Sequence, residues 1–421
     1  MREDPFVRTN LRWNAVVLSL DYGLFGLGLT FVSTSTILPA FAERLGAPNV
    51  VIGALLALLS VGWSFPGLFT ANYIERLSRK LPLILAVTTG ERLPFLVLAV
   101  VSCLFAASYP RAVLVLTLFL IAIMAFAGGA IMPAWMDLIA KLIPTTNRGR
   151  FFALGSTLGG LWGVGGTFLA GYFLRGYPYP LNYGLCFAAG FVALAASFVF
   201  LALAREHAVG SGKPAVGLGR YLRRLPFVLR GNSNFRWYLV GRSVGTLGTM
   251  AVTFYTVYAL KELRVDEGQV AAFTFFVLAA QTVSNVVLGW LADRLGHKLV
   301  LLLGSIALAV GSLLAVAADS LPGLYGVFAM VGISASAFGI SGLNILLEFC
   351  EPQDRPTYLG LGGALLAPFS FAAPMLGGWL ADQAGFLAVF WASAALSGTS
   401  ALLLSLLVRE PRRVAPTTHL F

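Results

Sequence analysis

The chain has 421 residues, of which 58% are hydrophobic and 11% are charged, and its mean hydropathy is +0.83. Ordinary soluble domains carry roughly 25% charged residues, and the exterior of a soluble fold must still face water. The composition therefore excludes a soluble globular protein and predicts an all-α integral membrane protein. The formal net charge of +11 does not indicate nucleic-acid binding, because the basic residues lie in short segments between apolar runs, where they report orientation.

The cysteines and histidines give no sign of a disulfide framework or a metal site. The cysteines lie singly in or beside apolar stretches, and the histidines fall in predicted loops or in the tail; these residues are Cys103, Cys186, Cys350, His207, His297 and His419. Neither set has the spacing of metal ligands. We therefore expect no metal and no cofactor.

Twelve apolar segments are long enough to cross a bilayer, since a span needs roughly 20 mainly apolar residues. In chain order these predicted spans cover residues 13–39, 49–72, 82–107, 112–141, 151–174, 181–204, 236–260, 268–292, 299–318, 322–347, 357–381 and 385–408. The first is too long for the core of a signal peptide, and further spans follow it. We interpret it as a retained first helix.

The basic residues predict the orientation of the chain. With the N-terminus inside, nearly all lysines and arginines of the loops and tails fall on the cytoplasmic side, and the opposite side receives only Arg44, Arg111, Arg175, Lys261 and Arg264. This asymmetry follows the positive-inside rule. It predicts a multi-pass protein of a bacterial inner membrane with both termini in the cytoplasm.

A long basic, glycine-containing break at residues 205–234 separates residues 1–204 from residues 235–421 and gives two sets of six spans. Its segment Tyr221 to Leu229 could form a surface amphipathic helix, although a solvated linker explains it as well. The two halves echo one another, because Arg12-Trp13 opens span 1 and Arg236-Trp237 opens span 7. Repeated halves are typical of secondary transporters.

Two loops carry a family resemblance. The sequence GWLADRLGHK, residues 289–298, lies between spans 8 and 9, and ANYIERLSRK, residues 71–80, lies between spans 2 and 3. Placed in this way, they resemble the signature loop of the major facilitator superfamily. The first copy departs from the pattern at Ala71, Glu75 and Ser78. The resemblance implies twelve helices in two six-helix bundles, a transport function and a monomer.

In this superfamily the loop acts as a cytoplasmic latch between conformations. The resemblance assigns that role to Glu75, Arg76, Arg79, Asp293 and Arg294, and it makes Asp137 and Glu348 the acids that meet the loop arginines. Locally, an acid can stabilise a helix N-terminus and an arginine can bind neighbouring acids. Ordinary interfacial ion pairing is the alternative interpretation.

Asp21 lies about nine residues into the first span, which at 1.5 Å per residue is roughly 13 Å deep. Ionisable groups at this depth are costly unless they are paired or hydrated, so each is a functional hypothesis. The Asp21 carboxylate can take up and release a proton during a transport cycle. An ion pair with Arg92, at similar depth in span 3, is an equally good interpretation.

Three further charges complete the intramembrane set: Glu91, Arg92 and Arg242. Glu91 and Arg92 are adjacent, so their side chains leave the helix about 100° apart, and at least one of them needs a partner on another helix. Span 3 usually lies at the bundle periphery in this superfamily. Structural bracing is therefore favoured over substrate contact for this pair.

Polar residues of spans 7, 8 and 10 are candidates for lining a substrate cavity. Arg242 and the span 7 threonines follow one another at spacings of 4, 3, 4 and 3, which places them on one helix face. The amides of spans 8 and 10 could bind a polar substrate, although interhelical hydrogen bonding explains them nearly as well. The candidates are Thr246, Thr249, Thr253, Thr256, Gln281, Asn285 and Asn344.

Span 5 carries small residues at every fourth position, which permits close helix packing. These glycines are Gly155, Gly159, Gly163 and Gly171. We expect packing rather than substrate contact, because a glycine offers a substrate no side chain.

The sequence as a whole favours a secondary transporter that moves a small solute by alternating access, coupled to protons, with export preferred over uptake. A proton-independent facilitator and a sugar or nutrient importer are the alternatives within transport. An integral membrane enzyme acting on lipid-linked substrates would need clustered acids or histidines at the membrane surface, which the sequence does not contain. The expected partners are a small-molecule substrate, protons and the lipid bilayer, without nucleic acid.

Overall fold

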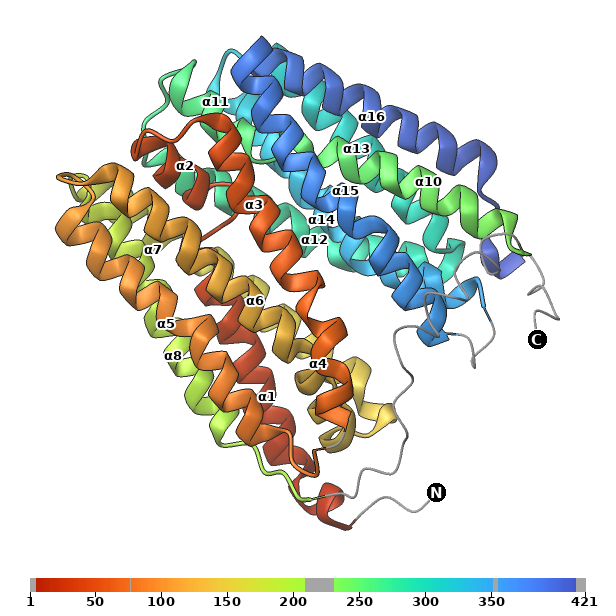
Figure 1. Ribbon diagram of the computed structural model, residues 1–421. Coiled ribbons are helices and arrows are strands. Elements are labelled where there is room, and N and C mark those ends of the chain that lie inside the picture. Colours follow the sequence, from red (N-terminus) through yellow and green to blue (C-terminus); the bar gives the residue numbers. More distant parts are fainter. Residues whose placement is uncertain (1–4, 76, 209–230, 351–354, 414–421) are drawn as a thin grey trace. The chain divides into compact units, whose positions relative to one another are not determined.

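The computed structural model describes residues 5–75, 77–208, 231–350 and 355–413, and these ranges form helices without any strand (Figure 1). Within these ranges, eight helices are long and apolar enough to cross a membrane. They are α5 (Leu81–Phe105), α6 (Pro110–Leu142), α8 (Leu181–Ala202), α12 (Gln269–Leu295), α13 (His297–Ala317), α14 (Leu321–Glu348), α15 (Arg355–Ala384) and α16 (Phe386–Leu407). Their length and composition confirm a multi-pass membrane protein.

The other four spans are made of less regular or less apolar helices. The glycine-rich α7 (Thr145–Gly176) is continuous, whereas span 1 consists of α1 (Pro5–Thr30) and α2 (Ile37–Arg44). Span 2 consists of α3 (Asn49–Ser64) and α4 (Pro66–Glu75), and span 7 consists of α10 (Ser233–Gly248), η1 (Thr249–Ala251) and α11 (Phe254–Lys261). With these, the chain has the predicted twelve-span architecture.

The structure interrupts three of the predicted spans, 13–39, 49–72 and 236–260, which we expected to be continuous helices. Each interruption has a local cause. The run of hydroxyl residues from Ser33 to Thr36 offers the backbone alternative hydrogen bonds. Pro66 has no N–H to continue α3 and instead begins α4. In span 7 the Thr249 hydroxyl donates to the Thr246 carbonyl at 2.7 Å, where the helix changes to a 3₁₀ turn.

Proline and glycine set several helix ends. A proline occupies the first turn of α5, α6 and α14, where a missing N–H costs nothing. Gly296 separates α12 from α13 with φ of 102°, and Gly385 separates α15 from α16 with φ of 82°. Only glycine adopts this backbone conformation without strain, so both tight connections depend on it.

The chain divides into two compact units. Unit 1 comprises Met1–Ala47, Leu58–Ala215 and Asp266–Thr274, and unit 2 comprises Pro48–Ala57, Val216–Val265 and Phe275–Phe421. The boundary along the chain therefore falls in the predicted break at residues 205–234. Two short segments depart from this division along the chain. The first turns of α3 are grouped with unit 2, and the first turns of α12 are grouped with unit 1. The predicted amphipathic segment Tyr221 to Leu229 lies outside the described residues.

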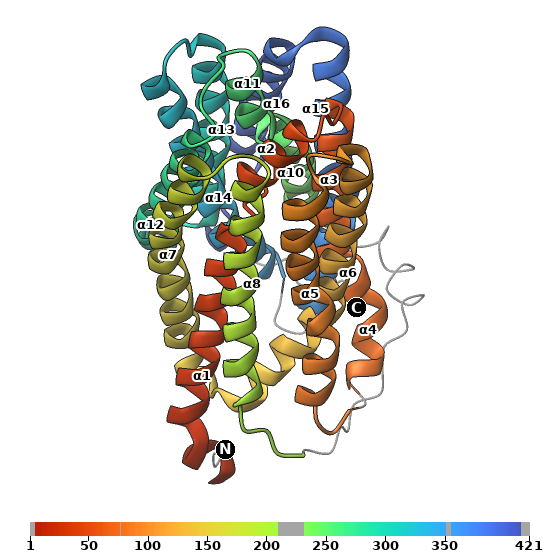
Figure 2. The ribbon, with the colours of Figure 1, turned by 90° about the vertical axis from the view of Figure 1, so that its left-hand side faces the viewer.

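The two units repeat one packing pattern. In unit 1, α1 packs against α7 and α8, and α5 packs against α6 and α8 (Figure 2). In unit 2, α10 packs against α15 and α16, and α13 packs against α14 and α16. Each unit therefore has the same order of neighbours, with α1, α5, α6, α7 and α8 corresponding to α10, α13, α14, α15 and α16.

The same repetition reaches individual hydrogen bonds after the last helix of each unit. The Asn14 side chain bonds both the N–H and the carbonyl of Arg205, at 2.9 and 3.0 Å. The Asn234 side chain does the same to Arg409, at 2.8 and 2.9 Å. These amides anchor the chain where it leaves α8 and α16.

The glutamate that follows each anchored arginine binds the start of a neighbouring helix. Glu206 accepts the N–H groups of Lys80 and Leu81 at 2.9 Å, and Glu410 accepts the N–H of Lys298 at 3.1 Å. Both carboxylates thus satisfy otherwise free donors at a helix N-terminus and lie near its positive dipole end.

Each unit has its own apolar core. Leu18, Ile84 and Leu138 are among the fully buried side chains of unit 1, where α1, α5 and α6 meet. In unit 2 the buried rings of Phe235 and Tyr238 pack on residues of α14 and α15. Unit 1 also contains a polar cluster beside its core, described next.

Candidate functional site

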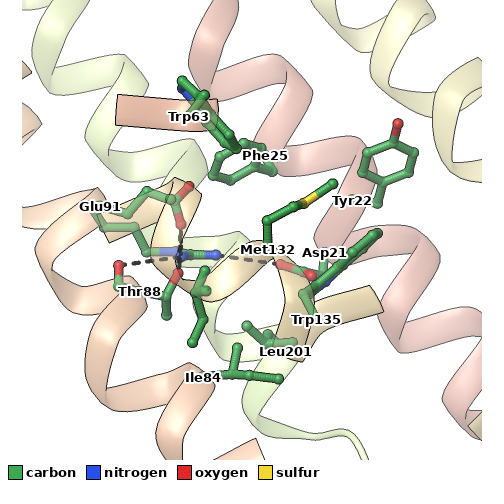
Figure 3. Close-up of a pocket in the computed structure, with 13 residues that line it drawn as sticks. Asp21, Tyr22, Phe25, Trp63, Ile84, Thr88, Glu91, Met132, Trp135 and Leu201 are labelled. Atoms are coloured by element: carbon green, nitrogen blue, oxygen red, sulfur yellow. Dashed lines mark hydrogen bonds and ion pairs between the residues drawn. The ribbon is translucent and has the colours of Figure 1, made fainter. Parts of the chain in front are cut away.

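A cavity of about 140 Å³ lies inside unit 1, lined by residues of α1, α3, α5, α6 and α8 (Figure 3). Most of its wall is apolar. Four aromatic side chains contribute to it: Tyr22 and Phe25 from α1, Trp63 from α3 and Trp135 from α6. The rings of Tyr22 and Trp135 are 5.6 Å apart, and those of Phe25 and Trp63 are 6.5 Å apart. Aromatic rings thus make up much of the cavity wall.

Three charged side chains reach the same cavity: Asp21, Glu91 and Arg92. The side chain of each residue is at least 94% buried. The Arg92 guanidinium lies 3.5 Å from the Asp21 carboxylate and 3.4 Å from the Glu91 carboxylate. The structure therefore brings together the three acidic and basic residues predicted for spans 1 and 3, and a single guanidinium serves both acids.

Two hydroxyl groups connect the arginine to the acids. Ser197 of α8 accepts from Arg92 Nη2 at 2.9 Å and donates to Asp21 Oδ1 at 2.6 Å. Thr88 of α5 accepts from Arg92 Nη1 and donates to Glu91 Oε2 at 2.8 Å. Each carboxylate is thus bound to Arg92 both directly and through one hydroxyl.

The remaining contacts of Arg92 leave it little freedom. Its Nε donates to the Leu194 carbonyl at 3.0 Å, and its guanidinium lies over the rings of Phe25 and Phe198 at 5.6 and 5.7 Å. The guanidinium is therefore held by α1, α5 and α8 at once. A solute that competed for it would have to displace several internal hydrogen bonds.

The charges of this cluster do not balance. With both acids ionised, Asp21 and Glu91 carry two negative charges against the single positive charge of Arg92, and the other residues that line the cavity are uncharged. An uncompensated buried charge is costly. The uptake of one proton, or of a cationic group, removes the excess.

The polar residues predicted in spans 7, 8 and 10 do not gather in this cavity. Thr246 and Thr249 donate to carbonyls of their own segment at 2.8 and 2.7 Å, and Thr253 and Thr256 are buried. The expected single stripe is interrupted because span 7 is not one continuous helix.

The amides of α12 and α14 have local partners in unit 2. Asn285 accepts from Ser336 at 2.7 Å, and Asn344 donates to the carbonyl of Ile340. Gln281 lies on the same helix as Asn285 and is half-buried. The bond of Asn285 joins two helices, whereas that of Asn344 lies within α14.

Arg242 is separate from the Arg92 cluster, since it belongs to α10 of unit 2. Its guanidinium lies 4.2 Å from the centre of the Phe338 ring. Among the residues that the structure describes, Arg242 forms no ion pair with an acid. A charge-pair partner for it is therefore not found in the described ranges.

The two acids of the predicted latch have these described partners. Asp137 lies 3.4 Å from Lys80, the last residue of the loop at residues 71–80. Glu348 contacts Arg412, which follows α16, and lies 3.7 Å from His297. Arg412 also donates to the carbonyls of Ala292 and Asp293, at the end of α12.

The other latch residues have few described contacts. Arg294 lies over the Trp290 ring at 4.5 Å, and Arg79 is exposed. Arg76 and the side chain of Glu75 lie outside the described residues. The latch assignment therefore stays a prediction from family resemblance.

The glycines of α7 lie against α1 within unit 1. A side chain at Gly155 would overlap the Tyr22 ring, and one at Gly159 would approach Gly23 and Gly26 at 3.6 to 3.9 Å. Gly163 is buried, whereas Gly171 would meet Ala271 at 3.4 Å. This arrangement agrees with the packing interpretation.

Thr88, Ser197 and Trp135 were not among the residues predicted from the sequence. Thr88 precedes Arg92 by four positions and so shares its helix face, which is a usable signal. Ser197 is a lone hydroxyl in the charge-free span 181–204, and its weak signal is polarity alone. Trp135 is within hydrogen-bonding reach of Asp21, but nothing in its sequence context distinguishes it from an interfacial tryptophan.

Comparisons with known proteins agree with this architecture. The sequence model of the Major Facilitator Superfamily matches residues 243–419. A gallate transporter of Pseudomonas putida is 27% identical over 373 residues, which cover 82% of this chain and 79% of that protein. The multidrug resistance protein MdtG of Serratia proteamaculans is 30% identical over 155 residues, or 35% of each chain.

Other relatives match only in part. An uncharacterized MFS-type transporter of Mycobacterium tuberculosis (strain ATCC 25618 / H37Rv) is 30% identical over 190 residues, which cover 44% of this chain. The match spans 28% of the length of that relative.

Solved structures share the fold at low sequence identity. A mutant of the nucleoside transporter NupG superposes with a TM-score of 0.72 and 16% identity, covering 95% of this chain and 100% of that chain. A D-xylose-proton symporter superposes with a TM-score of 0.67 and 15% identity, covering 96% and 99%.

Proposed function

We propose that the chain is a transporter of the major facilitator superfamily, whose sequence model matches residues 243–419, and that it moves a small organic solute across the membrane by alternating access, coupled to protons through Asp21. The observation that carries this proposal is the sharing of one buried guanidinium by two buried carboxylates beside a cavity. An excess negative charge in this place favours the binding of a proton.

Asp21 is a better proton carrier than Glu91 because of where its contacts lead. Glu91 is held by Thr88 and Arg92, which belong to the same helix, α5. Asp21 of α1 contacts Arg92 of α5 and Ser197 of α8. A proton on Asp21 therefore acts directly on contacts between three helices, whereas a proton on Glu91 acts first on its bonds to Thr88 and Arg92 of its own helix.

The cavity supports a solute with one ring or a group of similar size. Its volume of about 140 Å³ is close to that of an engineered apolar cavity of about 150 Å³ that binds benzene. The gallate transporter among the relatives covers most of this chain, which supports a small aromatic solute. A larger solute would extend beyond this cavity.

The direction of transport and the membrane belong to the same proposal. The relative MdtG supports our preference for export but matches only about a third of the chain, whereas the gallate transporter matches over 82%. We propose a monomer in a bacterial inner membrane with both termini in the cytoplasm. A proton-independent facilitator, in which Asp21 only braces the bundle, is the main alternative.

Proteoliposomes that contain a pH-sensitive dye test the coupling. Wild type and Asp21→Asn are compared while aromatic acids, sugars, nucleosides and cationic drugs are added in turn. We expect one class of solute to move protons with wild type. In Asp21→Asn we expect this proton movement to fall to the background of empty vesicles, because an amide cannot carry the proton.

Exchange of labelled solute without a pH gradient provides the control, since it needs solute binding and helix movement but no net proton transfer. Asp21→Asn should retain exchange. Glu91→Gln should also retain exchange, but its proton movement should weaken, because it removes the excess negative charge that favours the proton on Asp21. Proton-coupled uptake at the wild-type rate in Asp21→Asn would disprove the role of Asp21. Solute movement without any pH change in wild type would leave a facilitator.

A further inference from the structure

Arg242 is a positive charge in α10 that no described acid balances. It lies nine residues after the start of the helix, which is about 13 Å along its axis. Its Nε is buried, and within the described part of the chain this atom has no hydrogen-bond partner. A guanidinium at this depth without an acid is costly and marks a functional position.

The neighbours of Arg242 hold the guanidinium in place without neutralising it. Phe338 of α14 lies under its face at 4.2 Å, which is an attractive cation–π contact. The Tyr238 hydroxyl, one turn earlier on α10, lies within hydrogen-bonding reach and itself donates to the Gly342 carbonyl at 3.2 Å. The positive group is thus oriented by aromatic residues from two helices of unit 2.

Open space lies beside this guanidinium on α14. A Cβ atom added at Gly342 would meet only Arg242 Nη2, at 3.9 Å, and one added at Gly339 would meet no atom within 4 Å. Arg242 itself is half-buried, so a solute can reach it. The absence of side chains at these two glycines leaves room for a group that binds the outer edge of the guanidinium.

We propose that Arg242 binds the carboxylate of the transported solute and that the solute is an organic monoanion. The planar guanidinium presents paired donors that match a carboxylate. One positive charge balances one negative charge, so a doubly charged phosphate would leave an excess. The inference rests on the proposed function only in that the anion is the transported solute. It concerns the carboxylate group alone, does not use the cavity of unit 1 and does not depend on Asp21.

Equilibrium binding to the purified protein in detergent tests this inference without any proton gradient. The probes are acetate, benzoate and 1-naphthoate, each compared with its neutral amide and with the amine of the same carbon skeleton. Intrinsic tryptophan fluorescence, checked by calorimetry, reports binding. We expect at least one carboxylate to bind at least about tenfold more tightly than its amide and amine counterparts.

Variants assign that preference to the site. Arg242→Gln should lose the preference for the carboxylate, and Arg242→Lys should retain part of it, because lysine keeps the charge but not the paired geometry. Gly342→Val should weaken binding by filling the open space while leaving the arginine intact. Arg111→Gln, which changes an exposed arginine at the start of α6, is the matched control and should bind as wild type.

The outcomes separate this inference from the proton proposal. Carboxylate binding that is unchanged in Arg242→Gln, equal binding of the three members of every set, or no carboxylate binding up to ~10 mM would each overturn the inference. Asp21→Asn should bind the carboxylate normally, so failure of proton coupling leaves this result intact. If Arg242→Gln aggregates, Gly342→Val takes its place in the test. An unchanged affinity of Gly342→Val for the carboxylate would equally contradict the site.

Discussion

Arg92 illustrates what the sequence can and cannot say about a single residue. Ionisable residues at bilayer depth are rare and costly, so Asp21, Glu91 and Arg92 could be found from their positions in apolar spans. An ion pair between Asp21 and Arg92 was one of the two interpretations of the sequence. The sharing of Arg92 by both acids could not be predicted, because neighbouring residues on a helix point about 100° apart and the hydroxyls of Thr88 and Ser197 add to the direct contacts. Long side chains and hydroxyl bridges overcome that divergence.

Glu410 is a residue whose ionisation opposes its burial. It lies outside the spans, after α16, and accepts a hydrogen bond from the Lys298 N–H. Burial raises the pKa of Glu410 above its usual value of 4.5, and the nearby Glu348 raises it further, while the bond from Lys298 and the charge of Arg412 lower it. The net pKa is raised, so the folded state binds the proton more tightly than the unfolded state does.

The sign of the resulting pH dependence follows directly. The stability contributed by protonated Glu410 is fully present below pH 4.5, the ordinary pKa of a glutamate, and is lost as pH rises through the raised pKa. We therefore expect the unfolding temperature of wild type, relative to Glu410→Gln, to rise as pH is lowered from about 8 to about 5. Differential scanning fluorimetry of both proteins in one detergent measures this difference, and a difference that is constant with pH, or that falls, would contradict it.

At the scale of the elements, the positions of the helices could be predicted, but their interruptions could not. Apolar length predicts where a chain crosses the membrane, which gave all twelve spans. Apolar length does not report whether the backbone stays helical inside a span. The breaks after Thr30 and Gly248 occur among hydroxyl residues, which membrane helices also tolerate, so composition alone does not distinguish the two cases.

Close helix contact is a second property of the elements. Gly129 of α6 faces the backbone of α3, because a Cβ atom at Gly129 would overlap the Gly62 carbonyl oxygen and lie 3.0 Å from that of Trp63. Alanine is preferred to glycine in helices by up to about 1 kcal/mol. Overpacking against backbone costs about 1–3 kcal/mol, so the steric effect should win. We expect Gly129→Ala to lower the unfolding temperature.

Gly165 of α7 provides the matched control for this contact. No atom lies within 4 Å of a Cβ added at Gly165, so Gly165→Ala should leave the unfolding temperature unchanged or raise it slightly. Thermal unfolding of both variants in the same detergent measures the two effects. Equal shifts in Gly129→Ala and Gly165→Ala would show that helix propensity, rather than the contact between α3 and α6, determines the result.

At the scale of the whole molecule, the similarity of the two halves is clearer in the helix packing than in the sequence. The sequence shows short echoes such as Arg12-Trp13 and Arg236-Trp237. The structure adds the same order of helix neighbours in both units, together with paired asparagine anchors and glutamate caps after α8 and α16. Packing depends on shape and pattern rather than on identity, so the repeat persists where sequence similarity has faded.

The repeat does not extend to the charged residues of the candidate site. Asp21, Glu91 and Arg92 all belong to unit 1, whereas Arg242 belongs to unit 2 and has no described acid beside it. The halves therefore share a scaffold but not their charged residues. A prediction of the fold from repeated halves says nothing about which half carries which charge.

Orientation in the membrane is the last property that belongs to the whole molecule, and it can be measured on the two ends of α5. In a background where Cys103, Cys186 and Cys350 are replaced by alanine, Ser78→Cys lies before α5 and Ala107→Cys lies after it, and both positions are exposed. The distribution of lysine and arginine places Ser78 in the cytoplasm. An impermeant maleimide should therefore label Ala107→Cys in cells with a permeabilised outer membrane, and label Ser78→Cys only after the inner membrane is opened. Labelling in the reverse order would invert the assigned orientation, because each end of α5 reports the opposite side.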